Sequence, residues 1–343
     1  MKNPKILIIY TGGTIGMVND PETGALKPFD FEKLYNSVPE LKQFAYDLEA
    51  HSMKNPIDSS EMNPTIWAEI AKTIFDNYES YDGFVVLHGS DTMAYTASAL
   101  SFMLQGIKKP VILTGSQLPI GQIRTDGKEN LITAIEIAGL LDLAGEPMVQ
   151  EVAVYFEFQL YRGNRTTKES TSNFEAFSSQ NYPLLAEAGV DIEFNQSALL
   201  RKGFQKLELF SNFSTEVGLV KIYPGMNVKN LTSLFDYNIT KGVVIESFGN
   251  GNIFTSAEFE TMMKNFIEKG GIILNITQCG KGTVSYGKYE TSQMFMRLGV
   301  VNGYDMTTEA AITKMMYVMG RYTERSDQIM ALEKNSCGEF TIS

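Results

Sequence analysis

The sequence predicts an α/β protein with two domains, a larger N-terminal domain built on a mostly parallel sheet and a smaller C-terminal α/β domain. The chain has 343 residues, which at roughly 100–200 residues per domain corresponds to about two domains. Short runs rich in β-branched residues alternate with stretches of helical periodicity, as in parallel sheets flanked by helices. The strand-like runs lack polar alternation, which is expected for strands buried on both faces.

The N-terminal domain is expected to contain four strands, at residues 5–10, 83–88, 110–115 and 151–156. Helices are expected between these strands. Asn63 and Pro64 form a cap and a first-turn proline, and apolar residues then recur at helical spacing. Residues 91–105 are apolar nearly all round and predict a buried helix, and Asp126 opens a further one.

The alternation stops in residues 191–215, which we interpret as an extended connection between the domains. This connection divides the chain into an N-terminal domain of residues 1–190 and a C-terminal domain of residues 216–343. The C-terminal domain is expected to contain strands at 242–247 and 271–277, and helices at 256–268, at 307–319 and after Glu324.

The composition excludes several classes of function. Lys plus Arg number 29 and Asp plus Glu number 40, so the formal net charge is −11, which argues against binding nucleic acid or an anionic membrane. Two cysteines and two histidines are too few for a disulfide framework or a zinc site built from His or Cys. No apolar run suits a signal peptide or the ~20 residues of a membrane span. We therefore expect a cytoplasmic protein without a metal.

The candidate functional residues follow the predicted strands, because ligands of parallel sheets bind beyond the carboxyl ends of the strands. After the first strand, Gly12 and Gly13 permit a tight turn that presents Thr14. After the second strand come Ser90 and Asp91. A helix cap or a simple turn is the alternative interpretation at both places. The glycine spacing does not match that of nucleotide-binding motifs.

A polar segment at residues 161–170 carries the cationic side chains of Arg162, Arg165 and Lys168. We interpret it as a solvated basic loop, as a structural anchor for carboxylates elsewhere, or as the source of a cation near Asp91, because a lysine desolvated in a pocket can act as a base. Two hydroxyls, a carboxylate and a lysine suit nucleophilic attack on a carboxamide without histidine or metal. His88 is interpreted as a core residue at a strand end, because no Gly-x-Ser-x-Gly elbow accompanies it.

Five ordered strings, TGGTIG, DSSEM, HGSDTMAYTASAL, TGSQLP and YRGNRTTK, make the chain resemble the L-asparaginase family, specifically its type I or cytoplasmic bacterial form. The resemblance covers essentially the whole chain. It implies an asparaginase-like fold with a larger N-terminal and a smaller C-terminal α/β domain. It also implies hydrolysis of L-asparagine to L-aspartate and ammonia without a cofactor, in a homodimer or a homotetramer of two intimate dimers.

The resemblance implies a role for each matching residue. Thr14 is the expected nucleophile, which forms an acyl-enzyme ester. Ser90, Asp91 and Lys168 match a second hydroxyl–carboxylate–lysine group, and Asp91 also matches the residue that holds the α-ammonium group of the substrate. The other residues expected to contact the substrate are Asp58, Ser59 and Ser60 (the two serines at its α-carboxylate), Gly89, Ser116 beside the leaving amide, and Asn252, which reaches into the neighbouring subunit's site.

Three positions depart from the family pattern. Most members have threonine at the position of Ser90, and the missing methyl group loosens rotamer control. The loop after TGGTIG commonly carries a tyrosine, where this chain has Ala25. Some type I enzymes bind effector asparagine with an arginine at the position of Glu246. Thr167 and Cys279 match that effector site, but an acid in place of a cation opposes binding of a carboxylate, and we expect no activation by asparagine.

Two alternative functions remain from the sequence. The first is the asparaginase-like subunit of a tRNA-dependent amidotransferase, which normally carries an extra N-terminal domain, whereas TGGTIG begins ten residues into this chain. The second is a non-catalytic amino-acid sensor. Thr14, Asp91 and Lys168 argue against a sensor, because binding alone does not require all three.

Overall fold

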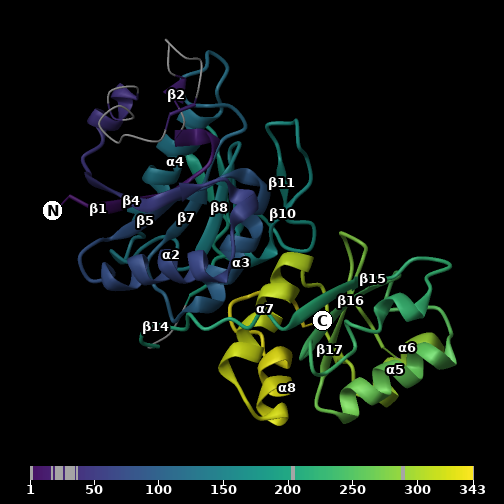
Figure 1. Cartoon of the computed structure of the whole chain (residues 1–343). Helices are drawn as coiled ribbons and strands as arrows, with labels where there is room; N and C mark the ends of the chain where they lie inside the picture. Colours follow the sequence, from purple (N-terminus) through teal and green to yellow (C-terminus); the bar gives the residue numbers. More distant parts are fainter. Residues whose placement is uncertain are drawn as a thin grey trace. The chain divides into compact units, whose positions relative to one another are not determined.

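The computed structural model describes residues 3–16, 18–19, 26–27, 35, 38–201, 205–286 and 290–342. The chain forms two compact units, Met1–Ser211 and Asn212–Ser343, and each unit has its own main sheet (Figure 1). The loop position Ala25, at which the family tyrosine is missing, lies outside the described residues.

Unit 1 is built on an eight-stranded sheet. Its strands, in their order across the sheet, are β13 (Ile192–Phe194), β12 (Ala186–Ala188), β9 (Gln159–Arg162), β8 (Val152–Phe156), β7 (Val111–Thr114), β5 (Gly83–Leu87), β1 (Lys5–Gly12) and β4 (Asp47–Ile57). Neighbours from β4 to β8 pair in parallel, and those from β8 to β13 are antiparallel. The predicted mostly parallel sheet is therefore confirmed, with an antiparallel extension at one end.

The strand order of this sheet reverses at β1. The chain places β4 on one side of β1 and then returns to place β5 on its other side. The carboxyl ends of β1 and β5 therefore lie side by side at a topological switch point, which is where open α/β sheets bind ligands.

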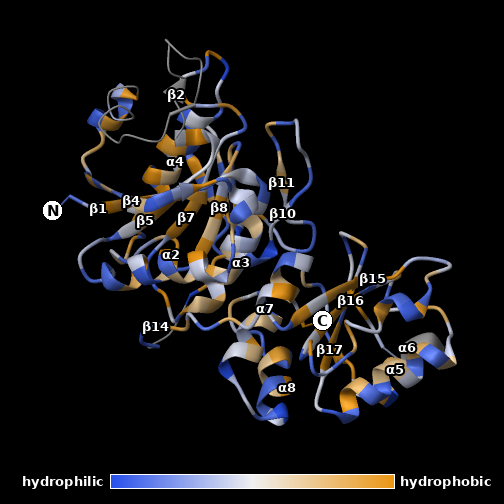
Figure 2. Cartoon of the chain, viewed as in Figure 1, coloured by the Kyte–Doolittle hydropathy of each residue, from blue (hydrophilic) through white to orange (hydrophobic). Residues whose placement is uncertain are grey.

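The unit 1 helices cover both faces of the sheet, with α4 (Gly127–Gly139) on one face and α2 (Pro64–Asp76) and α3 (Met93–Met103) on the other (Figure 1). Asn63 Oδ1 accepts two backbone N–H groups at the start of α2, so the predicted cap is confirmed. Every residue of α3 except Tyr95 is buried. The central strands they cover are strongly hydrophobic (Figure 2).

The predicted interdomain connection, residues 191–215, contains regular structure that belongs to unit 1. Its first part forms β13, which pairs with β12, and a later part forms β14 (Glu208–Leu209), which pairs with β6 (Leu104–Gln105). The prediction missed these strands because they are only two or three residues long and half exposed, so they carry no hydrophobic pattern.

Unit 2 is built on a parallel sheet, in agreement with the predicted smaller α/β domain. Its strands, in order, are β15 (Val217–Lys221), β16 (Gly242–Ser247), β17 (Ile272–Thr277) and β18 (Val301–Asn302). Its helices are α5 (Ala257–Glu268), α6 (Glu290–Leu298), α7 (Thr308–Arg321) and α8 (Arg325–Glu333). Ser256 and Thr307 cap α5 and α7. The prediction found both central strands and three of the helices, but not β15, β18 or α6. Within the described part of the chain, no helix has the length and apolar character that crossing a membrane requires.

Candidate active site

The turns after β1, β4 and β5 touch one another at the switch point of unit 1. A Cβ atom on Gly13 would lie 2.4 Å from the backbone nitrogen of Gly89, and one on Gly89 would lie 2.6 Å from the Oγ of Ser59. Such distances leave no room for a side chain at either glycine. Gly12 and Gly13 also have φ angles of +126° and +85°, a region that favours glycine. The predicted turns after β1 and β5 therefore meet, and the turn after β4, which was not predicted as a strand end, meets them there.

Thr14 lies directly after this contact. It begins the short 3₁₀ helix η1 (Thr14–Gly16) and is half-buried. The ring of Tyr10 packs against Gly16 at the other end of η1, where a Cβ would come within 2.3 Å of that ring. Burial raises the pKa of Tyr10 to about 12, so the phenol stays protonated at neutral pH.

Ser90, Asp91 and Lys168 form one hydrogen-bonded cluster. Lys168 Nζ lies 2.9 Å from Ser90 Oγ and 2.6 Å from Asp91 Oδ1. The lysine belongs to the short strand β10 (Thr167–Lys168), which pairs with β11 (Phe177–Ser178). Its side chain is only 13% exposed, whereas that of Asp91 is 68% exposed. The cluster thus presents a shielded cation and an accessible carboxylate, and the basic segment does bring a cation to Asp91.

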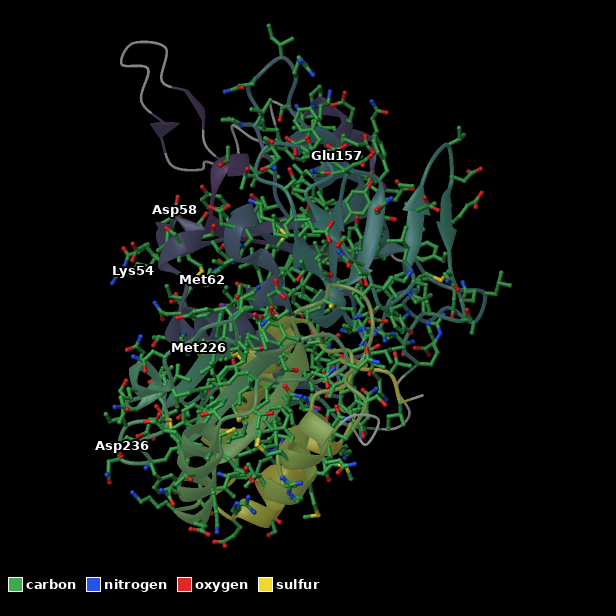
Figure 3. The ribbon with its side chains drawn as sticks, turned by 90° about the vertical axis from the view of Figure 1, so that its right-hand side faces the viewer. Lys54, Asp58, Met62, Glu157, Met226 and Asp236 are labelled. Atoms are coloured by element: carbon green, nitrogen blue, oxygen red, sulfur yellow. The ribbon has the colours of Figure 1, made fainter. Side chains whose placement is uncertain are left out.

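Asp58, Ser59 and Ser60 lie at the end of β4, where Figure 3 labels Asp58 with Lys54 and Met62 of the same segment. Asp58 Oδ1 accepts hydrogen bonds from the N–H and Oγ of Ser60, at 2.8 and 2.7 Å. These bonds lower the pKa of the Asp58 carboxyl group. The Ser59 carbonyl oxygen accepts from Thr92 Oγ1 at 2.7 Å, which ties this turn to the one carrying Ser90.

Ser116 and Gln117 follow β7 on the same edge of the sheet. Ser116 is 3% exposed, and its Oγ makes no hydrogen bond to any residue the structure describes. Gln117 was not predicted as a site residue, yet its Oε1 lies 3.4 Å from Ser90 Oγ. Its position beside Ser116 in TGSQLP was the only sequence signal that could have identified it.

Asp126 stands at the N-terminal end of α4, so the prediction that it opens this helix is confirmed. Its side chain makes no capping bond to α4. Its carboxylate instead accepts the backbone N–H groups of Gln117 and Leu118, at 2.8 and 3.1 Å. The Asp126 carboxylate therefore holds the loop after β7 and does not cap α4.

His88 is a buried core residue at the end of β5, as predicted. Its Nδ1 lies 2.6 Å from the Gly89 carbonyl oxygen, and its Nε2 lies 2.8 Å from Thr96 Oγ1. Trp67 Nε1 donates to the same threonine oxygen at 3.0 Å. Burial lowers the pKa of His88 to about 4, so the ring is neutral at pH 7. We assign the proton to Nδ1, because the carbonyl oxygen of Gly89 can only accept.

Asn252 and Glu246 belong to unit 2. Asn252 closes a tight turn after β16, in which its backbone and that of Phe248 exchange two hydrogen bonds of 2.8 Å. Glu246 is 6% exposed at the end of β16, with Lys221 Nζ 3.4 Å from its Oε2 and a hydrogen bond from Thr308. Of the two further effector-site matches, Thr167 lies in unit 1 and Cys279 is exposed in unit 2.

Among the described residues, no group of three His, Cys, Asp or Glu side chains is placed to hold a metal ion.

Comparison with known proteins places the chain in a family. The domain families Asparaginase, N-terminal, and Glutaminase/Asparaginase C-terminal domain match residues 5–200 and 216–332. L-asparaginase 1 of Escherichia coli (strain K12) is 37% identical over 99% of both chains. A glutamyl-tRNA(Gln) amidotransferase subunit of Methanopyrus kandleri is 33% identical over 99% of this chain and 75% of that protein. The crystal structure of L-asparaginase I from Vibrio cholerae has a TM-score of 0.89 at 36% identity, over 99% of this chain and 100% of that one. The chain therefore belongs to the asparaginase family and is an amidohydrolase with the two domains of that family.

Proposed function

We propose that the chain hydrolyses L-asparagine to L-aspartate and ammonia, with Thr14 as the nucleophile of an acyl-enzyme. The observation that carries the proposal is the Ser90–Asp91–Lys168 cluster, whose turn touches the turn of Thr14 through Gly13 and Gly89. This arrangement supplies a hydroxyl nucleophile and proton-transfer groups at one edge of one sheet, without histidine or metal.

The reaction uses these groups in two steps. Thr14 Oγ1 attacks the carbon of the substrate's side-chain carboxamide, and the Thr14 proton passes to the Ser90–Asp91–Lys168 cluster, in which the Asp91 carboxylate is the basic group while Lys168 is an ammonium. Collapse of the tetrahedral intermediate breaks the C–N bond, and ammonia leaves with that proton. Water then attacks the Thr14 ester and releases L-aspartate.

Substrate recognition follows from charge. The carboxylate of Asp91 is 68% exposed, so the α-ammonium group of the substrate can approach it while Lys168 binds its other side. Ser59 and Ser60 would hydrogen-bond the α-carboxylate, and the Ser60 hydroxyl would do so by giving up the bond that it donates to Asp58. Gly89 supplies backbone close to Ser59, and Ser116 has a buried hydroxyl available for the leaving amide.

We further propose a cytoplasmic homodimer or homotetramer without a cofactor, in which Asn252 of one subunit completes the site of another.

The test is ammonia release by the purified protein with asparagine and with glutamine, for wild type, Thr14→Ala and Lys168→Met. We expect both variants to lose activity by about 10⁴-fold or more, as nucleophile and proton-transfer groups that act as a unit do. Lys72→Met is the matched control, because Lys72 is 66% exposed on α2. Equal rates in wild type and both site variants would contradict the mechanism.

The likeness to an amidotransferase subunit supports a second candidate function, ammonia supply to a tRNA-linked reaction. Turnover of free asparagine by the purified chain alone would exclude it. Binding of asparagine without turnover would instead favour an amino-acid sensor.

A further inference from the structure

The side chain of Gln117 joins Ser90 to a neighbouring loop through the two ends of its amide. Nε2 donates to the backbone oxygen of Asn173 at 2.8 Å, and Oε1 accepts from Ser90 Oγ at 3.4 Å. Because the Asn173 carbonyl oxygen can only accept, it determines which end of the amide faces Ser90. The amide oxygen is therefore the atom presented to the hydroxyl group.

The Gln117 amide oxygen accepts the hydroxyl proton of Ser90, whose oxygen already accepts a hydrogen bond from Lys168. Lys168 Nζ donates to Ser90 Oγ at 2.9 Å, and an ammonium group has no acceptor for the serine proton. The serine proton therefore points to Gln117. The series from Lys168 through Ser90 to Gln117 sets both the rotamer of the serine and the direction of its proton.

The backbone that carries Gln117 is held by the first turn of α4. The Asp126 carboxylate, in a residue 7% exposed, accepts from the N–H groups of Gln117 and Leu118. Asn130 Nδ2 donates to the Gly115 carbonyl oxygen at 3.1 Å. The amide of Gln117 thus extends from a loop anchored on both sides of it.

A serine at position 90 depends on such a contact more than a threonine would. Serine has a single heavy atom on Cβ and three open χ1 positions, whereas threonine is β-branched and restricted. We propose that Gln117 is a positioning residue, which holds the Ser90 hydroxyl toward Lys168 and so replaces the rotamer control that a threonine methyl group gives. This inference rests on the proposed function, because Ser90 acts in that reaction.

The test is a double-mutant cycle of Gln117→Met and Ser90→Thr, measured as kcat and KM for asparagine. Methionine keeps the length of Gln117 and removes both amide ends. In the Ser90 protein we expect Gln117→Met to lower kcat about three- to tenfold, the effect of one hydrogen bond, with a smaller change in KM. In the Ser90→Thr protein we expect less than about a twofold loss. Gln122→Met, at an exposed glutamine of the same loop, is the matched control.

Several outcomes would overturn the inference. If Gln117 only supports the loop of Asn173, kcat falls equally in the Ser90 and Ser90→Thr proteins. Wild-type kcat in Gln117→Met, or an inactive Ser90→Thr protein, contradicts it as well. If Gln117→Met does not fold, Gln117→Asn takes its place in the cycle, because it keeps the amide but withdraws it from Ser90. A wild type that releases no ammonia overturns the proposed function, and this inference with it, whereas equal losses beside an active wild type overturn this inference alone.

Discussion

Gly13 and Gly89 touch backbone to backbone, so that a Cβ atom on Gly13 would lie 2.4 Å from the nitrogen of Gly89. The contact joins the turn that presents Thr14 to the turn that presents Ser90 and Asp91. The two turns can lie this close only because neither residue carries a side chain.

Replacing Gly13 by alanine is expected to abolish activity and to destabilise unit 1. The new Cβ meets main-chain atoms that cannot rotate away, and the φ of +85° is itself unfavourable for alanine. Together these effects should lower the free energy of unfolding by about 2 kcal/mol or more. Urea denaturation and ammonia release measure both effects. Gly121→Ala is the control, because nothing lies within 4 Å of a Cβ there, and similar behaviour of the two variants would contradict the argument.

Ser90→Thr is expected to retain activity within about tenfold of wild type, because the hydroxyl that accepts from Lys168 is preserved. Ser90→Ala removes that hydroxyl and should lose about 10²-fold or more. Steady-state rates of ammonia release compare the two. Near-complete loss in Ser90→Thr would show that the pocket is built around the smaller residue.

The neutral state of His88 predicts that stability falls at mildly acidic pH. Burial lowers the pKa of His88 from its usual 6.5 to about 4 in the folded protein, so the unfolded chain binds more protons between these values. The contribution is complete above pH 6.5 and is lost as the pH falls toward 4, up to about 3 kcal/mol in total.

Urea denaturation of wild type and His88→Gln from about pH 7.5 to about pH 4.5, a range across which the ring of the unfolded chain titrates, tests this assignment. The variant should lose less stability than wild type over this range. His51→Gln is the control, since His51 is exposed on β4. An identical pH dependence in wild type and His88→Gln would show that other groups are responsible.

Glu246 predicts a hyperbolic dependence of rate on asparagine concentration. Its buried carboxylate, paired with Lys221 and Thr308, stands where the family resemblance implies an effector-binding arginine. An acid at this place opposes binding of a carboxylate ligand. Initial rates over a wide range of asparagine concentration give the curve, and a clearly sigmoidal one would contradict the prediction.

Strongly patterned elements were predictable from the sequence, and weakly patterned ones were not. The five residues of β5 are all buried, and α3 is buried nearly all round, so each has an unmistakable signal. Strand β4 was missed because most of its residues are exposed and it pairs in the main sheet only with β1. Its residues therefore lack the continuous apolar run of a strand that is buried between two neighbours.

The candidate site also contains residues that the sequence could identify and residues that it could not. Thr14, Ser90 and Asp91 were predictable because each directly follows a recognisable strand. Gln117 was missed because the hydrogen bonds that distinguish it are made with Asn173 and Ser90, which are far from it in sequence. The sequence predicted that Asp126 opens α4 but not that its carboxylate holds the loop after β7, because a carboxylate before a helix has the same sequence pattern in either case.

The sequence by itself determined which chemical groups stand at the ends of the strands, and its scarcity of histidine and cysteine left Thr, Ser, Asp and Lys as the residues available for chemistry. Only the tertiary structure decided which of these groups meet. The pairing of Lys168 with Ser90 and Asp91 requires the β10–β11 ribbon to reach the turn after β5, and the closeness of this cluster to the Thr14 turn requires β5 to lie beside β1. Strand order and hairpin placement depend on packing between distant segments, which local residue patterns do not encode.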